Sequence, residues 1–560
     1  MKKVVHMRTL LSRMCNKLSR SVWLTRLLRL PVFQGVAERP GALMIQIDGL
    51  ARQQLEHALE YGEMPFLGRL IHFHRYKIHT HYSGLPSTTP AVQAELFYGI
   101  KTAVPAFSFR DRDSHDIVCM YTPEAAAKIE AQLDSSDHLA LLQNGSAYAD
   151  NFTGGATESH FCPSSMGWGP ALRSANPLVV LIFLLGNLYS FVRVAILLCL
   201  EVGLAFLDFG RGIIRGQDFF KELKFIPARV AISILLRELC VIGGKIDISR
   251  GLPIIHINFL GYDEQAHRRG PDSLFAHWTL KGIDDAIARL WRSANRAEWR
   301  NYDIWIYSDH GQAETTPYHQ FQGYPLQEAV RTTLEKMKVF LPGSAIKNTH
   351  SIQTQRFHYL GGDRIQRLFA FFVGHEEKND EEHPSLTALG PVGHVYLPQE
   401  LTQEERGFFV RELVDRHAIP VVIETNGPGM LRAWTRDGRF DLPQDSDRLF
   451  GAQHPFIAEL GDDLVRLCKH PVAGDFVLLG WREGVEPLTF AEENGSHAGA
   501  SPEETSGFAL FPPDVPLPET AARYLRPSDL RNSILKQMLG LQDQATESSG
   551  SDNEQACKAE

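Results

Sequence analysis

Three short and almost wholly apolar runs stand out along the chain. They occupy residues 42–47, 253–260 and 303–308, and an acidic residue follows each within three positions. Runs of this length and composition are typical of buried strands. Because helical patterns separate them, we predict an α/β fold with a central, mostly parallel sheet flanked by helices. Such sheets place their sites beyond the carboxyl ends of the strands, which is where these acidic residues fall.

A longer apolar stretch, residues 178–223, has a different pattern. When this stretch is projected onto a helix, five of its charged residues fall within one sector of roughly 80°. They are Arg193, Glu201, Asp208, Arg211 and Arg215. This pattern predicts a long apolar helical insertion that lies in or against a lipid bilayer. Three other interpretations stay open: a helical hairpin broken near residues 186–187, a single membrane span, and a buried helix of an oligomer interface or cap.

Length and composition indicate a large catalytic domain with insertions. The chain has 560 residues, of which 44% are hydrophobic, and its seven cysteines are scattered without a CxxC pair, which favours a reducing compartment. We divide it into a basic N-terminal arm (1–40), three parts of a catalytic core (41–110, 250–319 and 474–530), an insertion with the apolar helix (111–249), a second α+β insertion forming a cap or substrate region (320–473), and an acidic, disordered tail (531–560).

The charge is unevenly distributed. Residues 1–40 hold nine Lys or Arg and one acid, whereas the whole chain has a net charge of −9. The acidic remainder argues against a nucleic-acid partner. The arm is either a contact for an anionic membrane surface or a poorly ordered segment. We see no cleavable signal peptide, so we expect a cytoplasmic protein, or one associated with the cytoplasmic side of a membrane.

Seven side chains are candidates for a catalytic metal centre. They are Asp48, Thr89, Asp263, His267, Asp309, His310 and His497. Asp263 and His267 are four residues apart, which places both on one face of a helix. Carboxylates and imidazoles suit Zn²⁺, and carboxylates also accept Mn²⁺ or Mg²⁺. Six such ligands and one hydroxyl are what two divalent cations and a nucleophile require, which points to chemistry at phosphorus.

Five short motifs carry a resemblance to a known family. They are IDG (47–49), PSTT (86–89), GYDEQAH (261–267), SDHG (308–311) and GSHAG (495–499). In this order they resemble the alkaline phosphatase superfamily, and within it the type I phosphodiesterase/nucleotide pyrophosphatase branch. The resemblance implies an alkaline-phosphatase-like sheet. It also implies one metal on Asp263, His267 and His497, and another on Asp48, Asp309, His310 and Thr89.

The resemblance further implies that Thr89 is the nucleophile and forms a covalent phospho-threonine. We expect Zn²⁺ as the metal, with Mn²⁺ as the alternative. Thr88 fits the nucleophile position if the motif is aligned on Pro90 instead. Arg110 is a candidate for binding a phosphate oxygen, because guanidinium suits phosphate. A surface ion pair with a neighbouring Asp is the competing interpretation of Arg110.

We therefore predict a two-metal hydrolase of a phosphodiester or phosphate ester that associates with membranes. Residues 90–93 are Pro-Ala-Val-Gln instead of the branch's Phe-Pro-Asn-His, so a nucleotide preference is not supported. A sulfatase is disfavoured, because no C/S-x-P-x-R motif occupies the nucleophile position. Two alternatives remain: a transferase that moves a phospho-headgroup between a lipid and an acceptor, and a non-catalytic membrane scaffold that keeps the fold.

Overall fold

The computed structural model describes the chain from residue 20 to residue 539. Within that span it does not describe residues 28, 34, 36, 136–138, 166–180, 182–184, 215–230, 338–383, 426–430, 516 and 518–522. Most of the basic arm, the last part of the acidic tail and the centre of the second insertion therefore lie outside the described residues.

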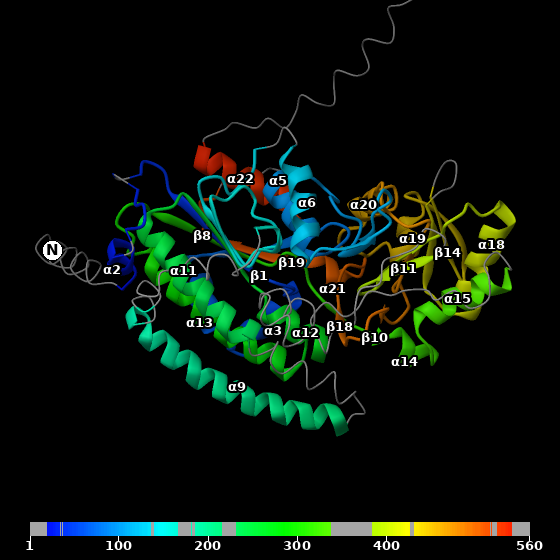
Figure 1. Cartoon of the computed structure of the whole chain (residues 1–560), viewed down its shortest axis with the longest axis horizontal. Coiled ribbons are helices and arrows are strands. Elements are labelled where there is room, and N and C mark those ends of the chain that lie inside the picture. The colour runs from blue at the N-terminus through cyan, green and yellow to red at the C-terminus, as the bar shows by residue number, and fades with distance from the viewer. Residues whose placement is uncertain are drawn as a thin grey trace, which may run out of the picture.

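A seven-stranded sheet forms the centre of the molecule (Figure 1). Its strands, in spatial order, are β2 (Lys77–Tyr82), β19 (Ser506–Phe511), β8 (Tyr302–Tyr307), β1 (Gly41–Ile47), β7 (Ile254–Phe259), β5 (Ser146–Tyr148) and β6 (Glu158–His160). Only β19 runs antiparallel to its neighbours, β2 and β8. The expected central, mostly parallel sheet is therefore confirmed, and the three apolar runs are its strands β1, β7 and β8.

Helices cover both faces of this sheet. Side chains of β1 alternate between the two faces, and those on each face pack into a separate apolar cluster. Leu43, Ile45 and Ile47 pack in a cluster with helices α3 (Arg52–Glu60), α4 (Pro65–His74), α11 (Arg237–Arg250) and α13 (Leu274–Ala294). Ala42 and Met44 face the other cluster, with α5 (Thr89–Tyr98), α6 (Pro123–Asp134) and α22 (Pro527–Leu539). All seven residues of β1 are buried, which explains why all but one of them, Gln46, are apolar or glycine.

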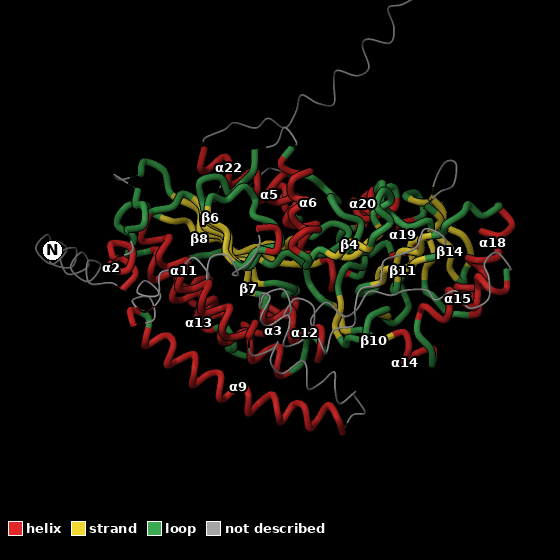
Figure 2. The backbone as a smooth tube through the Cα atoms, viewed as in Figure 1, coloured by secondary structure: helices red, strands yellow, loops and turns green. Residues whose placement is uncertain are grey.

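A second sheet of six strands lies beside the first (Figure 2). In spatial order it contains β11 (Ser385–Ala388), β12 (Val392–Tyr396), β16 (Phe476–Leu479), β13 (Val421–Glu424), β14 (Leu431–Thr435) and β15 (Gly438–Leu442). Every pairing in it is antiparallel. Helices α15 (Leu326–Lys336) and α18 (Gln403–Arg411) share one apolar cluster with it, and α20 (Ile457–Cys468) shares another.

Two expected boundaries differ from the structure. The run at 474–481 was expected to return to the catalytic core, but β16 pairs with β12 and β13 in the second sheet, and the chain rejoins the central sheet only at β19. The disordered tail was expected from 531, but helix α22 continues to Leu539. Leu530 and Ile534 of this helix are buried in the apolar cluster that also contains Ala42 and Met44 of β1, and this burial stabilises the helix.

The apolar insertion also needs correction. Its described part is helix α9 (Leu188–Ile214), and Arg193 near its start forms an ion pair of 2.6 Å with Asp285 on α13. Among the residues that the structure describes, no helix combines the length and apolar character needed to cross a membrane. The single span that the sequence left open is therefore not supported, and the remaining residues of 178–223 fall largely outside the described part.

Candidate metal centre

The candidate ligands converge at the carboxyl edge of the central sheet. Asp48 directly follows β1, and Asp309 and His310 follow the neighbouring strand β8 after one residue, Ser308. Asp263 and His267 lie on α12 (Gly261–Arg269), which starts two residues after β7. Parallel strands end at the same edge, so residues more than 200 positions apart in the sequence become neighbours.

The other two candidates come from outside these strands. Thr89 is the first residue of helix α5, which begins after the loop that leaves β2. His497 follows the short strand β18 (Gly495–Ser496), which pairs with β9 (Ala313–Glu314) just after the SDHG motif. This pairing anchors the His497 loop beside Asp309 and His310.

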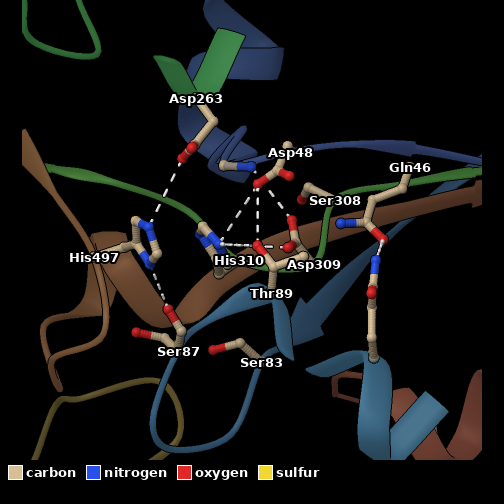
Figure 3. A network of polar contacts seen from close by, with 12 residues as sticks. Gln46, Asp48, Ser83, Ser87, Thr89, Asp263, Ser308, Asp309, His310 and His497 are labelled. Atoms are coloured by element: carbon tan, nitrogen blue, oxygen red, sulfur yellow. Dashed lines mark hydrogen bonds and ion pairs between the residues drawn. The ribbon is translucent and has the colours of Figure 1, made fainter. Parts of the chain in front are cut away.

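One group of ligands surrounds the Thr89 hydroxyl (Figure 3). Ligand atoms of Asp48, Asp309 and His310 all lie within 4.8 Å of one another. The Thr89 hydroxyl donates to Asp48 Oδ1 at 3.3 Å and lies 3.4 Å from His310 Nε2. All four side chains are buried, so the hydroxyl is held among potential metal ligands and away from bulk water.

A second group lies next to the first and includes Asp263. Asp263 Oδ1 is 3.4 Å from His267 Nε2 and 3.8 Å from His497 Nε2. Ligand atoms of Asp263, His310 and His497 lie within 4.8 Å of one another, and the rings of His310 and His497 stack at 3.8 Å between centroids. The two groups therefore share His310, and together they bring all seven predicted side chains to one place.

Hydrogen bonds from a surrounding layer fix the ligands. Asn258 donates to Asp48 Oδ2 at 2.8 Å, and Gln312 donates to Asp263 Oδ1 at 2.5 Å. Glu493 Oε2 lies 2.9 Å from His267 Nδ1, which leaves Nε2 of that ring facing Asp263. A carboxylate behind a ligating histidine orients its ring and sets its tautomer.

Sequence reasoning missed these three supporting residues. Gln312 directly follows the SDHG motif, and Glu493 lies four residues before His497. Neither position carries a periodicity or spacing that indicates its role. Asn258 lies within the apolar strand β7, and only the polarity of its side chain there could have indicated a role at the site.

The electrostatics of the cluster favour a cation. Asp48, Asp263 and Asp309 are all at most 1% exposed, and three carboxylates buried this closely repel one another. Burial and the charge of Asp263 raise the pKa of Asp309 to about 7, and Asp309 Oδ2 accepts no hydrogen bond from the described residues. Divalent cations would neutralise these charges, and the Asp/His donor set suits Zn²⁺ or Mn²⁺.

The histidines respond in opposite directions. Burial lowers the pKa of His497 well below its usual value, and the charge of His310 lowers it further. Burial also opposes protonation of His267, but Asp263 and Glu493 outweigh it and raise the pKa well above the usual value. In the absence of a cation, a protonated His267 is the group that balances part of the negative charge.

The structure separates the two candidate threonines. Thr89 contacts the ligand group, whereas the buried hydroxyl of Thr88 has no hydrogen-bond partner among the described residues. Arg110, at the end of β3 (Ser108–Arg110), donates from Nε to the carbonyl of His115, and its backbone N–H donates to the Tyr396 hydroxyl. Its proposed contact with phosphate stays a prediction.

A further group with metal-ligand character lies outside this centre. It consists of His57, Asp272 and His277. The ring nitrogens of His277 already contact Glu63 at 2.5 Å and Gln54 at 3.2 Å. These hydrogen bonds account for the geometry of the group without a metal.

Comparison with known proteins finds a family match over part of the chain. Residues 254–403 match the model of the family described as type I phosphodiesterase/nucleotide pyrophosphatase. This segment includes β7, α12 and β8, and with them four of the predicted ligands. The match contains two of the five motifs, GYDEQAH and SDHG, and it supports the resemblance to this family and a phosphoester hydrolase.

Solved structures resemble the chain more distantly. Phosphonoacetate hydrolase from Sinorhizobium meliloti 1021, in complex with phosphonoformate, is 15% identical with a TM-score of 0.43, over 89% of this chain and 96% of that one. Murine ectonucleotide pyrophosphatase/phosphodiesterase 5, in complex with AMP, is 11% identical with a TM-score of 0.43, over 90% and 96%. At these scores neither likeness carries an argument about this chain. Among curated proteins, none matches the sequence significantly.

Proposed function

We propose that the protein hydrolyses a phosphodiester with two divalent cations and a covalent intermediate on Thr89. The observation that carries this proposal is the position of the Thr89 hydroxyl, 3.3 Å from Asp48 and 3.4 Å from His310, inside a buried group of metal ligands. An ordinary hydroxyl in a structural role has no need of this surrounding. A hydroxyl that must become an alkoxide needs metal ligands around it, because a hydroxyl is a weak nucleophile at its usual pKa.

The residues divide into two ligand groups. Asp48, Asp309 and His310 would hold one cation beside Thr89, and Asp263, His267 and His497 would hold the other. When bound, the cations supply positive charge that lowers the pKa of the Thr89 hydroxyl and stabilises charge on the ester oxygens.

The chain's own groups then perform the substitution. Thr89 loses its proton toward Asp48 Oδ1, and Thr89 Oγ1 attacks phosphorus as the bond to the leaving alkoxide breaks. The leaving alkoxide takes up the proton that Asp48 received and departs as an alcohol. A water molecule then attacks the phospho-threonine from the vacated side, which restores the Thr89 hydroxyl and releases a phosphomonoester. Thr89 lies in the amino-terminal turn of α5, whose backbone N–H groups and positive dipole end would favour the negative charge of a phosphoryl group bound there.

The test is an assay of the full-length protein loaded with Zn²⁺ or Mn²⁺. We expect release of nitrophenol from bis(4-nitrophenyl) phosphate, faster than from 4-nitrophenyl phosphate. Thr89→Ala should abolish it. No release from either ester with either metal would overturn the proposal. Addition of glycerol separates hydrolysis from transfer, because a transferase would form a glycerol phosphoester at the expense of the hydrolysis product.

A further inference from the structure

Helix α9 presents its apolar side chains to the outside of the molecule. Leu188, Tyr189, Val192, Ile196 and Phe206 are 56%, 67%, 50%, 58% and 58% exposed. The helix lies along the outer side of α13, away from both sheets (Figure 1). Scattered exposed apolar residues are ordinary, but five on one helix form a continuous patch of the kind that marks an interaction site.

Arg193 and Val194, on the same helix, face inward. Arg193 pairs with Asp285 on α13 at 2.6 Å, and the adjacent Val194 is 3% exposed. A helix on the surface of a water-soluble domain has the opposite arrangement, with its apolar stripe toward the core. The ion pair therefore fixes α9 with its apolar face outward, and it removes the charge of Arg193 from that face.

Helix α2 (Arg20–Leu27) lies beside the start of this apolar helix. Leu24 is buried and packs at Gly186, just before α9, and Thr25 hydrogen-bonds Ser249 on α11 at 2.9 Å. These contacts anchor α2, while Trp23 and Leu27 on it remain exposed. Two basic residues, Arg26 and Arg29, are exposed beside them.

We propose that this α2–α9 surface docks onto the surface of an anionic lipid bilayer. An exposed apolar helix face with basic residues at one end suits insertion among lipid chains at a membrane interface. Tyr189 and Trp23 are of the residue type that settles at the level of lipid headgroups. Arg26 and Arg29 at one end complement anionic headgroups, as in helices that lie in the plane of a membrane interface.

Cys199 provides a direct probe of this surface. It is exposed on α9, whereas Cys119, Cys162, Cys240 and Cys468 are buried. The full chain with Cys15→Ser and Cys557→Ser can be labelled at Cys199 with an environment-sensitive fluorophore. On vesicles of equal parts phosphatidylcholine and phosphatidylglycerol, we expect its emission to shift to shorter wavelength and to be quenched by brominated lipid. A matched label on the second-sheet side, made by Cys199→Ser with Phe321→Cys, should not respond.

Vesicle sedimentation measures the affinity. Replacing Leu188, Val192 and Ile196 by Ser should lower partition onto the anionic vesicles by at least about tenfold, because it removes three inserting side chains. Serine at Phe321 and Phe408, which are also exposed but lie in the second-sheet region, is the matched control and should leave partition unchanged. Arg26→Gln with Arg29→Gln should weaken binding to anionic vesicles and not to neutral ones. Thermal unfolding verifies that each variant is folded.

Three results would overturn the proposal. One is the absence of any fluorescence response or sedimentation of the unmodified chain with anionic vesicles. Another is equal partition of the triple-serine variant and its control. The third is a dimer in sedimentation velocity that the triple-serine change dissociates, since the occupant of this face would then be a second copy of the chain. None of these readouts depends on the catalytic activity.

Discussion

The two sheets of this protein differ in what they contribute to the metal centre. The central sheet supplies Asp48, Asp309 and His310 directly from the ends of β1 and β8, and β7 leads into the helix that carries Asp263 and His267. The antiparallel second sheet supplies none of the seven candidates. Neighbouring strand ends of an antiparallel sheet alternate between its two edges, so they do not gather side chains at one edge as parallel strands do.

The second sheet nevertheless contacts the site through one turn. Gly390, between β11 and β12, has a φ of +88°, and a Cβ atom on it would lie 2.6 Å from the carbonyl oxygen of His497. Phe490 also donates its backbone N–H to Gly390. The central sheet therefore carries most of the candidate metal ligands, whereas the second sheet supports the loop that carries one of them, His497.

The largest expected effect comes from Thr89→Ala. Loss of the nucleophile should lower kcat for the diester by on the order of 10⁴-fold, while metal content and folding stay close to those of the unchanged protein. Steady-state kinetics and metal analysis check this. Thr88→Val is the matched control, because the Thr88 hydroxyl has no hydrogen-bond partner among the residues that the structure describes. A Thr88→Val variant that loses activity while Thr89→Ala retains it would reverse the assignment.

Removal of a supporting group should cost less. Glu493→Gln keeps the shape of the side chain but removes the carboxylate charge behind His267, and we expect a loss of about 10–100-fold in metal affinity or activity. Competition with a chelator measures the affinity. Glu492→Gln, at the exposed neighbouring position, should have little effect. Equal losses in both variants would contradict the role of Glu493.

Acid pH should weaken metal binding. The pKa of Asp309 lies at about 7 in the metal-free protein, above the ordinary value of 3.8, so a proton competes with the cation below about pH 7. Affinity should fall by up to about tenfold per pH unit as the pH drops below 7. The metal-free fold behaves in the opposite sense and loses stability as pH rises from 3.8 to about 7, because over this range Asp309 is ionised in the unfolded chain while its buried carboxyl stays protonated in the fold. Calorimetry with and without metal tests both directions.

The smallest effect sharpens the comparison of the sheets. Gly390→Ala should destabilise the fold by about 1 kcal/mol through its positive φ and should also lower metal affinity several-fold by displacing the His497 loop. Gly438 also has a positive φ, but no atom lies within 4 Å of the position of its Cβ. Gly438→Ala should therefore destabilise without a change in metal affinity. If the Gly390→Ala and Gly438→Ala variants bind metal with the same affinity, the second sheet does not support the site.

Much of the fold and site could be predicted from local sequence. The strands β1, β7 and β8 are buried on both faces, so their apolar runs were plain, and the ligands follow them directly. Residues 474–481 were assigned to the wrong sheet because an apolar run does not reveal which strand it pairs with. Helix α22 was missed because its stability comes from packing of Leu530 and Ile534 against distant residues. The inward direction of Arg193 depends on Asp285, a partner 92 positions away.

A metal titration of the chelated protein tests the central claim most directly. The account predicts that Zn²⁺ binds at two equivalents per chain and that diester hydrolysis reaches its maximum only when both are bound. Asp263→Asn, which alters one ligand group, should reduce the stoichiometry to one and abolish turnover. Full activity in the absence of bound metal, or a stoichiometry that Asp263→Asn leaves unchanged, would contradict the account.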